Sequence, residues 1–162
     1  MSAASKKAGT PTGLSRSRAR LAAVQALYQM DLAETDVAEV LEEFKAHPLV
    51  DETEPNALEE PDPEHFARLL RGVVAHQRDI DPLIDGQLAT GWRLVRIDSI
   101  LRAILRAATF ELMQLREVPA RVVISEYVEV AHAFFEGDES KVVNGVLDQL
   151  ARKLREGELP AR

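Results

Sequence analysis

The sequence predicts an all-α fold. Apolar residues recur at spacings of three and four in nearly every segment after residue 15, which is the periodicity of amphipathic helices. No segment alternates apolar and polar residues between turn dipeptides, so strands are not expected. With 162 residues, 46% of them hydrophobic, the chain can bury one core or two small subdomains that share it.

The first helix is predicted over residues 15–34 and is apolar on two sides. One side carries Leu21, Val24, Tyr28 and Leu32, and the opposite side carries Ala19, Ala22, Ala23, Ala26 and Met30. A helix that is apolar on both sides lies centrally in a fold. We therefore expect neighbouring helices to approach its alanine side closely.

A short helix over 37–46 and an acidic loop over 47–62 follow. The loop contains three prolines and many carboxylates, so we expect it to be exposed. Asp62 before Pro63 is typical of an N-cap followed by proline at the first helical position, and predicts a helix to about Ile80.

The second half of the chain is predicted to be helical as well. Asp138 is expected to cap the last helix, as an aspartate before a periodic segment commonly does. The predicted elements are a short helix over 81–89 stopped by Gly91, a strongly periodic helix within 96–115, a helix from Pro119 to Phe135, and a last helix over 139–155.

Two glycines, Gly72 and Gly145, each lie between apolar residues of a predicted helix. Glycine inside a helix costs about 1 kcal/mol relative to alanine. The simplest reason to keep it is a close helix crossing, which we predict at both positions.

Composition excludes several classes of function. The chain has no cysteine, hence neither disulfides nor a thiolate nucleophile, which fits the cytoplasm. It has no run of apolar residues long enough for a membrane span, and its N-terminus resembles a transit peptide only weakly. Glu126, Glu129 and His132 follow helical spacing, but a carboxylate-bridged metal site needs a second Glu-x-x-His pair. We expect no catalysis, metal or cofactor.

Charge is distributed unevenly along the chain. Residues 1–30 carry five cations and no acid, and residues 31–64 carry thirteen acids and one lysine, within a net charge of −7. Arg16 and Arg20 share one helix side, while Arg18 lies on another, and cations are unfavourable in a first helical turn. We expect an arginine-rich arm that orders on RNA or phosphate; solubilising residues at a frayed helix end are the alternative.

Four segments in order, "RSRARLAAVQALYQMDL", "ILRAATFEL", "VPARVVISEYVEVAHAFF" and "SKVVNGVLDQL", make the chain similar to the NusB family of transcription antitermination factors. The resemblance implies a helical domain over 15–155 with subdomains at about 15–80 and 81–155. Composition predicts a basic disordered tail over 1–14 and a frayed end over 156–162. The resemblance also implies binding to boxA RNA of ribosomal-RNA leaders with NusE, alongside RNA polymerase, NusA and NusG.

The resemblance assigns RNA-binding positions residue by residue. They are Arg16, Arg18, Arg20, Gln25, Tyr28, Asp138, Lys141 and Asn144. The chain departs from the family pattern at four positions: Ser17 for a common Arg, Ser125 for Asn, His132 for Lys and Val142 for Phe. An aromatic ring stacks on a base for about 1 to 3 kcal/mol, and whether this contribution is made with Val142 in place of Phe stays open. Tyr28 is equally well explained as a core residue with its hydroxyl at the edge.

Two other functions fit the same residues. One is a helical adaptor that binds only protein, its arginines being incidental. The other is the detached RNA-binding domain of a ribosomal-RNA methyltransferase, although no methyltransferase segment is present in the sequence.

Overall fold

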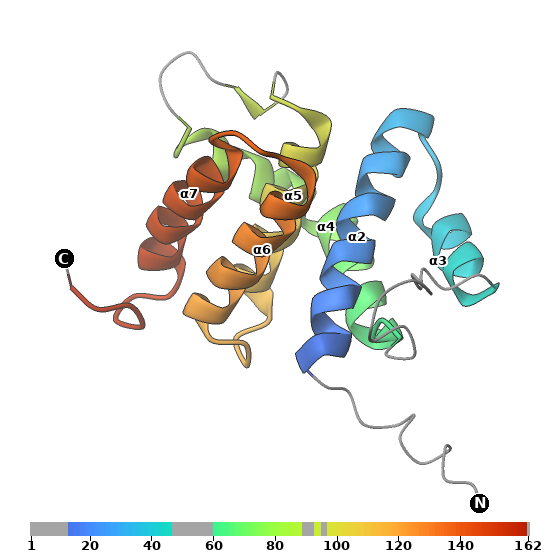
Figure 1. Cartoon of the computed structure of the whole chain (residues 1–162), viewed down its shortest axis with the longest axis horizontal. Coiled ribbons are helices and arrows are strands. Elements are labelled where there is room, and N and C mark those ends of the chain that lie inside the picture. The colour runs from blue at the N-terminus through green and yellow to red at the C-terminus, as the bar shows by residue number, and fades with distance from the viewer. Residues whose placement is uncertain (1–12, 47–59, 89–92, 95–96, 162) are drawn as a thin grey trace, which may run out of the picture.

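A computed structural model describes residues 13–46, 60–88, 93–94 and 97–161. Within these residues the chain is helical and contains no strand, so the predicted all-α class is confirmed (Figure 1). The helices are α2 (Gly13–Ala33), α3 (Val37–Ala46), α4 (Pro63–Asp85), α5 (Ser99–Gln114), α6 (Ala120–Phe134) and α7 (Glu139–Leu154).

Helix α2 packs with its alanine side against α4 and α5. Ala19 and Ala23 are completely buried, because small side chains let the neighbouring helices come close. The other predicted side is buried to different degrees: Val24 is completely buried, Leu21 and Tyr28 are half-buried, and Leu32 is 62% exposed. The central position of α2 was predicted correctly, whereas its apolar sides differ in burial more than expected.

Helix α4 begins as predicted but ends later. Asp62 caps it, since its carboxylate accepts hydrogen bonds from the backbone N–H groups of Glu64 at 3.0 Å and His65 at 3.2 Å. The separate helix expected over 81–89 is wrong: α4 continues through Pro82 to Asp85. Burial of Ile80 and Ile84 on either side of the proline holds this last turn, outweighing the one lost backbone hydrogen bond.

The remaining helix boundaries agree with the predicted ones to within a few residues. Asp98 caps α5 through bonds from the backbone N–H groups of Ile100 and Leu101, at 2.7 and 3.3 Å. Asp138 precedes α7 as expected, but its side chain makes no capping hydrogen bond. Residues 47–59 of the acidic loop, Gly91 and the first twelve residues lie outside the described ranges.

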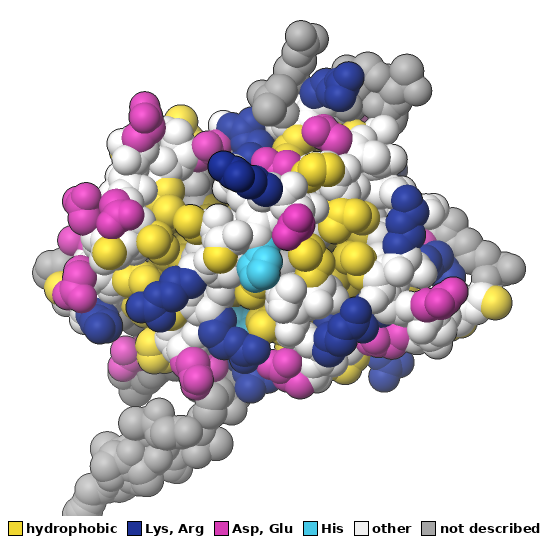
Figure 2. Space-filling view, turned by 180° about the vertical axis from the view of Figure 1, so that it is seen from behind, with side chains coloured by type: hydrophobic (Ala, Val, Ile, Leu, Met, Phe, Trp, Pro, Cys, Tyr) yellow, Lys and Arg dark blue, Asp and Glu magenta, His cyan; other side chains and the backbone are white. Residues whose placement is uncertain are grey.

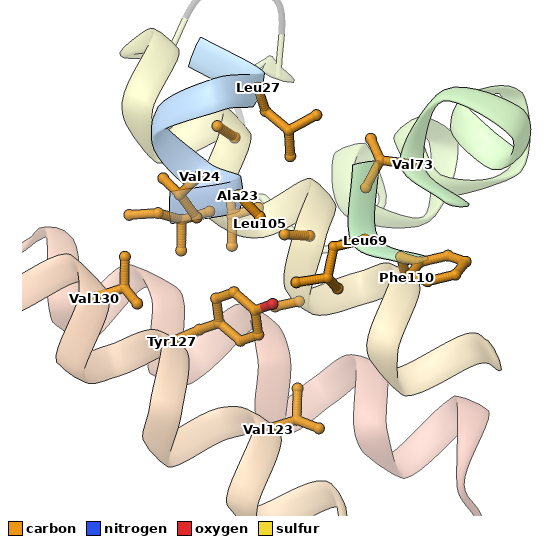
Figure 3. Packing of buried hydrophobic residues seen from close by; sticks show 14 of the residues in the cluster. Ala23, Val24, Leu27, Leu69, Val73, Leu105, Phe110, Val123, Tyr127 and Val130 are labelled. Carbon is orange, nitrogen blue, oxygen red and sulfur yellow. The ribbon is translucent and has the colours of Figure 1, made fainter. Parts of the chain in front are cut away.

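One cluster of buried apolar side chains draws on every described helix. Figure 3 shows its centre, where Val24 and Leu27 of α2 meet Leu69 of α4, Leu105 of α5 and Tyr127 of α6. The proposed division into two subdomains stays a prediction. None of the described helices combines the length and hydropathy that a membrane span requires.

The helical glycines Gly72 and Gly145 differ in how closely other atoms approach them. A Cβ on Gly72 would lie 2.1 Å from a ring atom of Phe110, so the predicted close crossing is confirmed there. At Gly145 the same construction meets no described atom within 4 Å. The predicted crossing at Gly145 is therefore wrong within the described part of this chain.

Candidate nucleic-acid interface

The arginine stretch is helical from Gly13 onward and is fastened to the body of the protein. The carbonyl of Ser15 accepts a hydrogen bond from the backbone N–H of Asp62 at 3.0 Å. Two residues further, the Ser17 hydroxyl donates to Glu126 Oε1 at 2.5 Å. These contacts order the turn without a ligand, in contrast to the expected arm that orders only on binding.

Arg20 points into the interior, where 3% of its side chain is exposed. Its Nε and one terminal nitrogen donate to the two carboxylate oxygens of Glu111, at 2.8 and 3.1 Å. Its other terminal nitrogen donates to Glu126 at 3.1 Å. The guanidinium of Arg20 is thus held in an internal ion pair, and its expected RNA contact stays a prediction.

Glu111 is the centre of this buried network. Besides Arg20, its Oε2 accepts a hydrogen bond from the Tyr127 hydroxyl at 2.5 Å and lies 3.4 Å from His65 Nε2. Burial acts to raise the pKa of Glu111, but the neighbouring His65 and the hydrogen bonds and positive charge of Arg20 outweigh it and lower that pKa to about 2. Burial, together with the charge of Glu111, raises the pKa of Tyr127 well above its ordinary value.

Arg16 and Arg18 remain at the surface. Arg16 is 45% exposed, and its Nε lies 3.8 Å from a carboxylate oxygen of Asp62. Arg18 is half-buried and forms no ion pair with any residue that the structure describes; its Nε is buried without a hydrogen-bond partner. Of the three arginines, Arg18 is therefore the one whose guanidinium has no ion pair among the described residues.

Gln25 and Tyr28 share the outward face of α2 with Arg18. Gln25 lies two helical turns beyond Arg18 and is exposed, and Tyr28 follows one turn later and is half-buried. Ten residues of helix separate Arg18 from Tyr28, a rise of about 15 Å. The face thus offers a guanidinium, an amide and a phenol in a row.

Asp138, Lys141 and Asn144 are exposed at the start of α7. The Lys141 ammonium lies 3.7 Å from the Asp138 carboxylate, and both side chains are more than 80% exposed. In Figure 1 the start of α7 is at the end of the molecule reached by the C-terminal end of α2, whereas the arginines are at the other end. Val142 packs partly against the core, and Ser125 and His132 are exposed.

The described residues contain no group of three or more histidines and carboxylates placed to hold a metal ion. Of the Glu-x-x-His helix, Glu126 is already bonded to Ser17 and Arg20. What the surface of α2 and α7 offers is cations and hydrogen-bonding groups suited to a polyanion.

The buried charges were missed by the sequence interpretation. Glu111 lies on the inner, apolar side of α5, three residues after Ala108. This position in the helical repeat was the signal in the sequence that could have predicted its burial. The burial of Arg155, which is 2% exposed, was also not predicted. Its guanidinium donates to the backbone carbonyls of Glu111, Leu112 and Leu115 at 2.9 to 3.0 Å.

Two relatives are about half identical to this chain in sequence. A transcription antitermination protein NusB from Rhodopseudomonas palustris (strain HaA2) is 52% identical over 88% of this chain and 85% of its own length. Its counterpart from Allorhizobium ampelinum is 48% identical over 96% of this chain and 97% of its own.

Solved structures show the same helical arrangement. NusB of T. maritima matches with a TM-score of 0.71 and 34% identity, covering 89% of this chain and 94% of that one. A crystal structure of antitermination factors NusB and NusE in complex with double-stranded RNA also matches with a TM-score of 0.71, at 25% identity over 88% and 99% of the two chains.

The family profile covers most of the described helical body. It matches residues 17–152, from the Ser17 turn of α2 into the last turn of α7. Together with the relatives of about half-identical sequence, this match shows that the chain belongs to the NusB family of non-catalytic transcription antitermination factors.

Proposed function

We propose that the chain binds boxA-type single-stranded RNA of nascent ribosomal-RNA leaders, together with NusE, in the cytoplasm. In this role it joins RNA polymerase, NusA and NusG in an antitermination complex. The observation that carries the proposal is Arg18, a surface arginine without an ion pair among the described residues, in line with Gln25 and Tyr28. A solved structure similar to this chain contains NusB, NusE and RNA, which supports the choice of partners.

We assign different roles to the predicted RNA-binding residues. Arg18 contacts phosphate, and Arg16 does so more weakly because Asp62 competes for it. Gln25 and Tyr28 continue the path toward Lys141 and Asn144 at α7. Arg20 is kept out of the contact set, because Glu111 and Glu126 hold it inside.

The acidic character of the chain makes a basic partner necessary. A protein of net charge −7 repels RNA at long range, so a few surface cations give weak binding on their own. NusE is the partner proposed to supply further positive surface. Linkage then requires that RNA strengthen the binding of NusE by the same factor by which NusE strengthens the binding of RNA.

A titration of boxA-type RNA at several salt concentrations, with and without NusE, tests the proposal. Each phosphate contact on a single strand contributes about −0.7 to the slope of log K against log salt. Arg18→Gln should remove about one such contribution and weaken binding to all sequences alike.

Arg78→Gln is the matched control, since Arg78 is an exposed arginine of α4 and is not among the residues proposed to contact RNA. It should leave the salt slope unchanged. RNA affinity that is equal in the original protein and both variants would contradict RNA binding by α2 and favour the adaptor that binds only protein.

A further inference from the structure

Glu126 of α6 bonds two residues of the arginine stretch through one carboxylate oxygen. Its Oε1 accepts a hydrogen bond from the Ser17 hydroxyl at 2.5 Å and another from a terminal nitrogen of Arg20 at 3.1 Å. Ser17 and Arg20 are three residues apart, so they share the side of α2 that meets α6. Arg18 lies between them in the chain and about 100° around the helix axis from Ser17. A contact that fixes Ser17 and Arg20 therefore also fixes the direction in which Arg18 leaves the helix.

The Ser17 hydroxyl has a second acceptor within reach. The backbone carbonyl of Gly13, one turn earlier in the same helix, lies 3.0 Å from it. A hydroxyl donates a single proton, and the carboxylate is both the closer and the stronger acceptor, so the bond to Glu126 is favoured. The bond to Gly13 would hold Ser17 only to its own helix, whereas the bond to Glu126 joins α2 to α6.

This part of α2 lies near a helix end. Helix α2 begins at Gly13, five residues before Arg18, and helix ends open more readily than helix centres. Asp62 supports the first turn, because its backbone N–H donates to the carbonyl of Ser15. Glu126 supports the next turn. Arg18 is thus held in place by contacts of the residues on both sides of it in the chain.

The position of each cation matters because the chain has fewer cations than acids, 20 Lys and Arg against 27 Asp and Glu. Figure 2 shows the molecule from behind, where Lys and Arg side chains are interspersed with Asp and Glu side chains. A broad basic patch can bind a strand in many arrangements. A protein that relies on few arginines gains affinity when these are ordered before the ligand arrives.

We propose that Glu126 is a positioning residue for RNA binding, which orders the turn over residues 17–20 and so presents Arg18 to phosphate. The inference rests on the proposed function, because it concerns the same contact of Arg18. Glu126 itself contacts no RNA and acts through Ser17 and Arg20. The fraction of molecules in which the turn is ordered then sets the apparent affinity for RNA.

Glu126→Ala and Glu129→Ala are a matched pair of variants. Both remove one carboxylate from α6, and Glu129 is exposed. Net charge alone predicts that both variants bind RNA slightly more tightly, because the chain becomes less acidic. Positioning predicts the opposite sign for one of them: Glu126→Ala should weaken boxA RNA binding about threefold in the presence of NusE, and Glu129→Ala should not weaken it. Glu126→Gln keeps an acceptor oxygen for Ser17 and should recover part of the loss.

Amide hydrogen exchange measured without RNA reports the order of the turn directly. Exchange of residues 16–20 should become faster in Glu126→Ala and stay unchanged in Glu129→Ala. The salt slope of RNA binding should be equal in the two variants, because neither substitution removes a phosphate contact. All measurements are made well below the melting temperature, so that a loss of global stability does not by itself lower RNA affinity.

A double-mutant cycle identifies the residue through which Glu126 acts. In a chain that already carries Arg18→Gln, Glu126→Ala should lose most of its effect on RNA affinity, because the arginine that it positions is absent. A merely structural role would give the same effect with and without Arg18.

Three results would overturn the positioning role: equal changes of RNA affinity in Glu126→Ala and Glu129→Ala, unchanged hydrogen exchange of residues 16–20, or an effect of Glu126→Ala that is independent of Arg18. Failure of the proposed function has a different signature. Arg18→Gln alone would then leave RNA affinity unchanged, and the role of Glu126 toward Arg18 would fail with it even if hydrogen exchange responds.

Discussion

Arg20 and Glu111 form a buried ion pair at the point where α2 meets α5. Removing two charges from water is costly. This cost is compensated by the bidentate contact and by two further hydrogen bonds, one that Tyr127 donates to Glu111 and one that Arg20 donates to Glu126. Arg16, four residues earlier on the same side, lies near the helix end and stays partly exposed beside Asp62. The position of an arginine along this side of the helix thus decides whether it is buried in the core or exposed at the surface.

Glu111→Gln should destabilise the fold strongly. The substitution keeps the shape of the side chain but leaves Arg20 buried with only Glu126 to balance its charge. Loss of one partner of a buried pair costs about 3 to 5 kcal/mol. Urea unfolding measures this cost. Glu129→Gln, at an exposed position, is the control and should change the unfolding free energy by close to zero. A cost below that of an ordinary surface substitution would show that the pair does not hold the helices together.

The same carboxylate predicts a pH dependence. The pKa of Glu111 is lowered from 4.5 to about 2 on folding. The unfolded chain therefore binds the proton more tightly, and the stabilisation is complete above pH 4.5 and disappears as pH falls toward 2. The unfolding free energies of the original protein and Glu111→Gln should converge between pH 6 and pH 3. A difference that is constant over this range would contradict the assignment.

At the scale of elements, Arg155 fastens the end of α5. It follows α7, and its guanidinium donates to the carbonyls of Glu111, Leu112 and Leu115 at the end of α5, where Glu111 and Leu115 also accept from the backbone N–H groups of Leu115 and Val118. One side chain thus joins the last helix to the central one, and keeps the carbonyls at the end of α5 bonded where they are buried.

Gly72 and Gly145 should respond oppositely to alanine. Gly72→Ala drives a Cβ into the Phe110 ring between α4 and α5, and overpacking of this kind costs about 1 to 3 kcal/mol. Gly145→Ala meets open space on α7 and should stabilise the isolated protein by about 0.5 to 1 kcal/mol. Thermal melts of the two variants test this. A stabilising Gly72→Ala or a destabilising Gly145→Ala would contradict it.

For the whole molecule, the sequence was sufficient to predict the helices because their apolar periodicity is strong. It failed near Pro82, where a separate helix was predicted from residue 81 but burial of Ile80 and Ile84 maintained the turn. It also overestimated the burial of Leu32, because apolar character alone does not say which side of α2 the other helices cover.

The site could be predicted only in part. Arg20 lies three residues before Ala23 and seven before Leu27 on the inner side of α2, so its burial was visible in the spacing. Its partner was not, because Glu111 is 91 positions away and periodicity does not pair distant residues. The proposed surface residues Gln25, Lys141 and Asn144 were available only through family resemblance.

The central claim is that the arginine stretch divides into a core residue and an RNA-binding residue. Arg18→Gln and Arg20→Gln, each measured for urea unfolding and for the salt dependence of boxA RNA binding in the presence of NusE, test it most directly. Arg18→Gln should reduce the salt slope by about 0.7 and leave stability nearly unchanged. Arg20→Gln should lower the unfolding free energy by about 3 kcal/mol or more and leave the slope unchanged. Reversal of this pattern, with the slope falling for Arg20→Gln and stability falling for Arg18→Gln, would contradict the account.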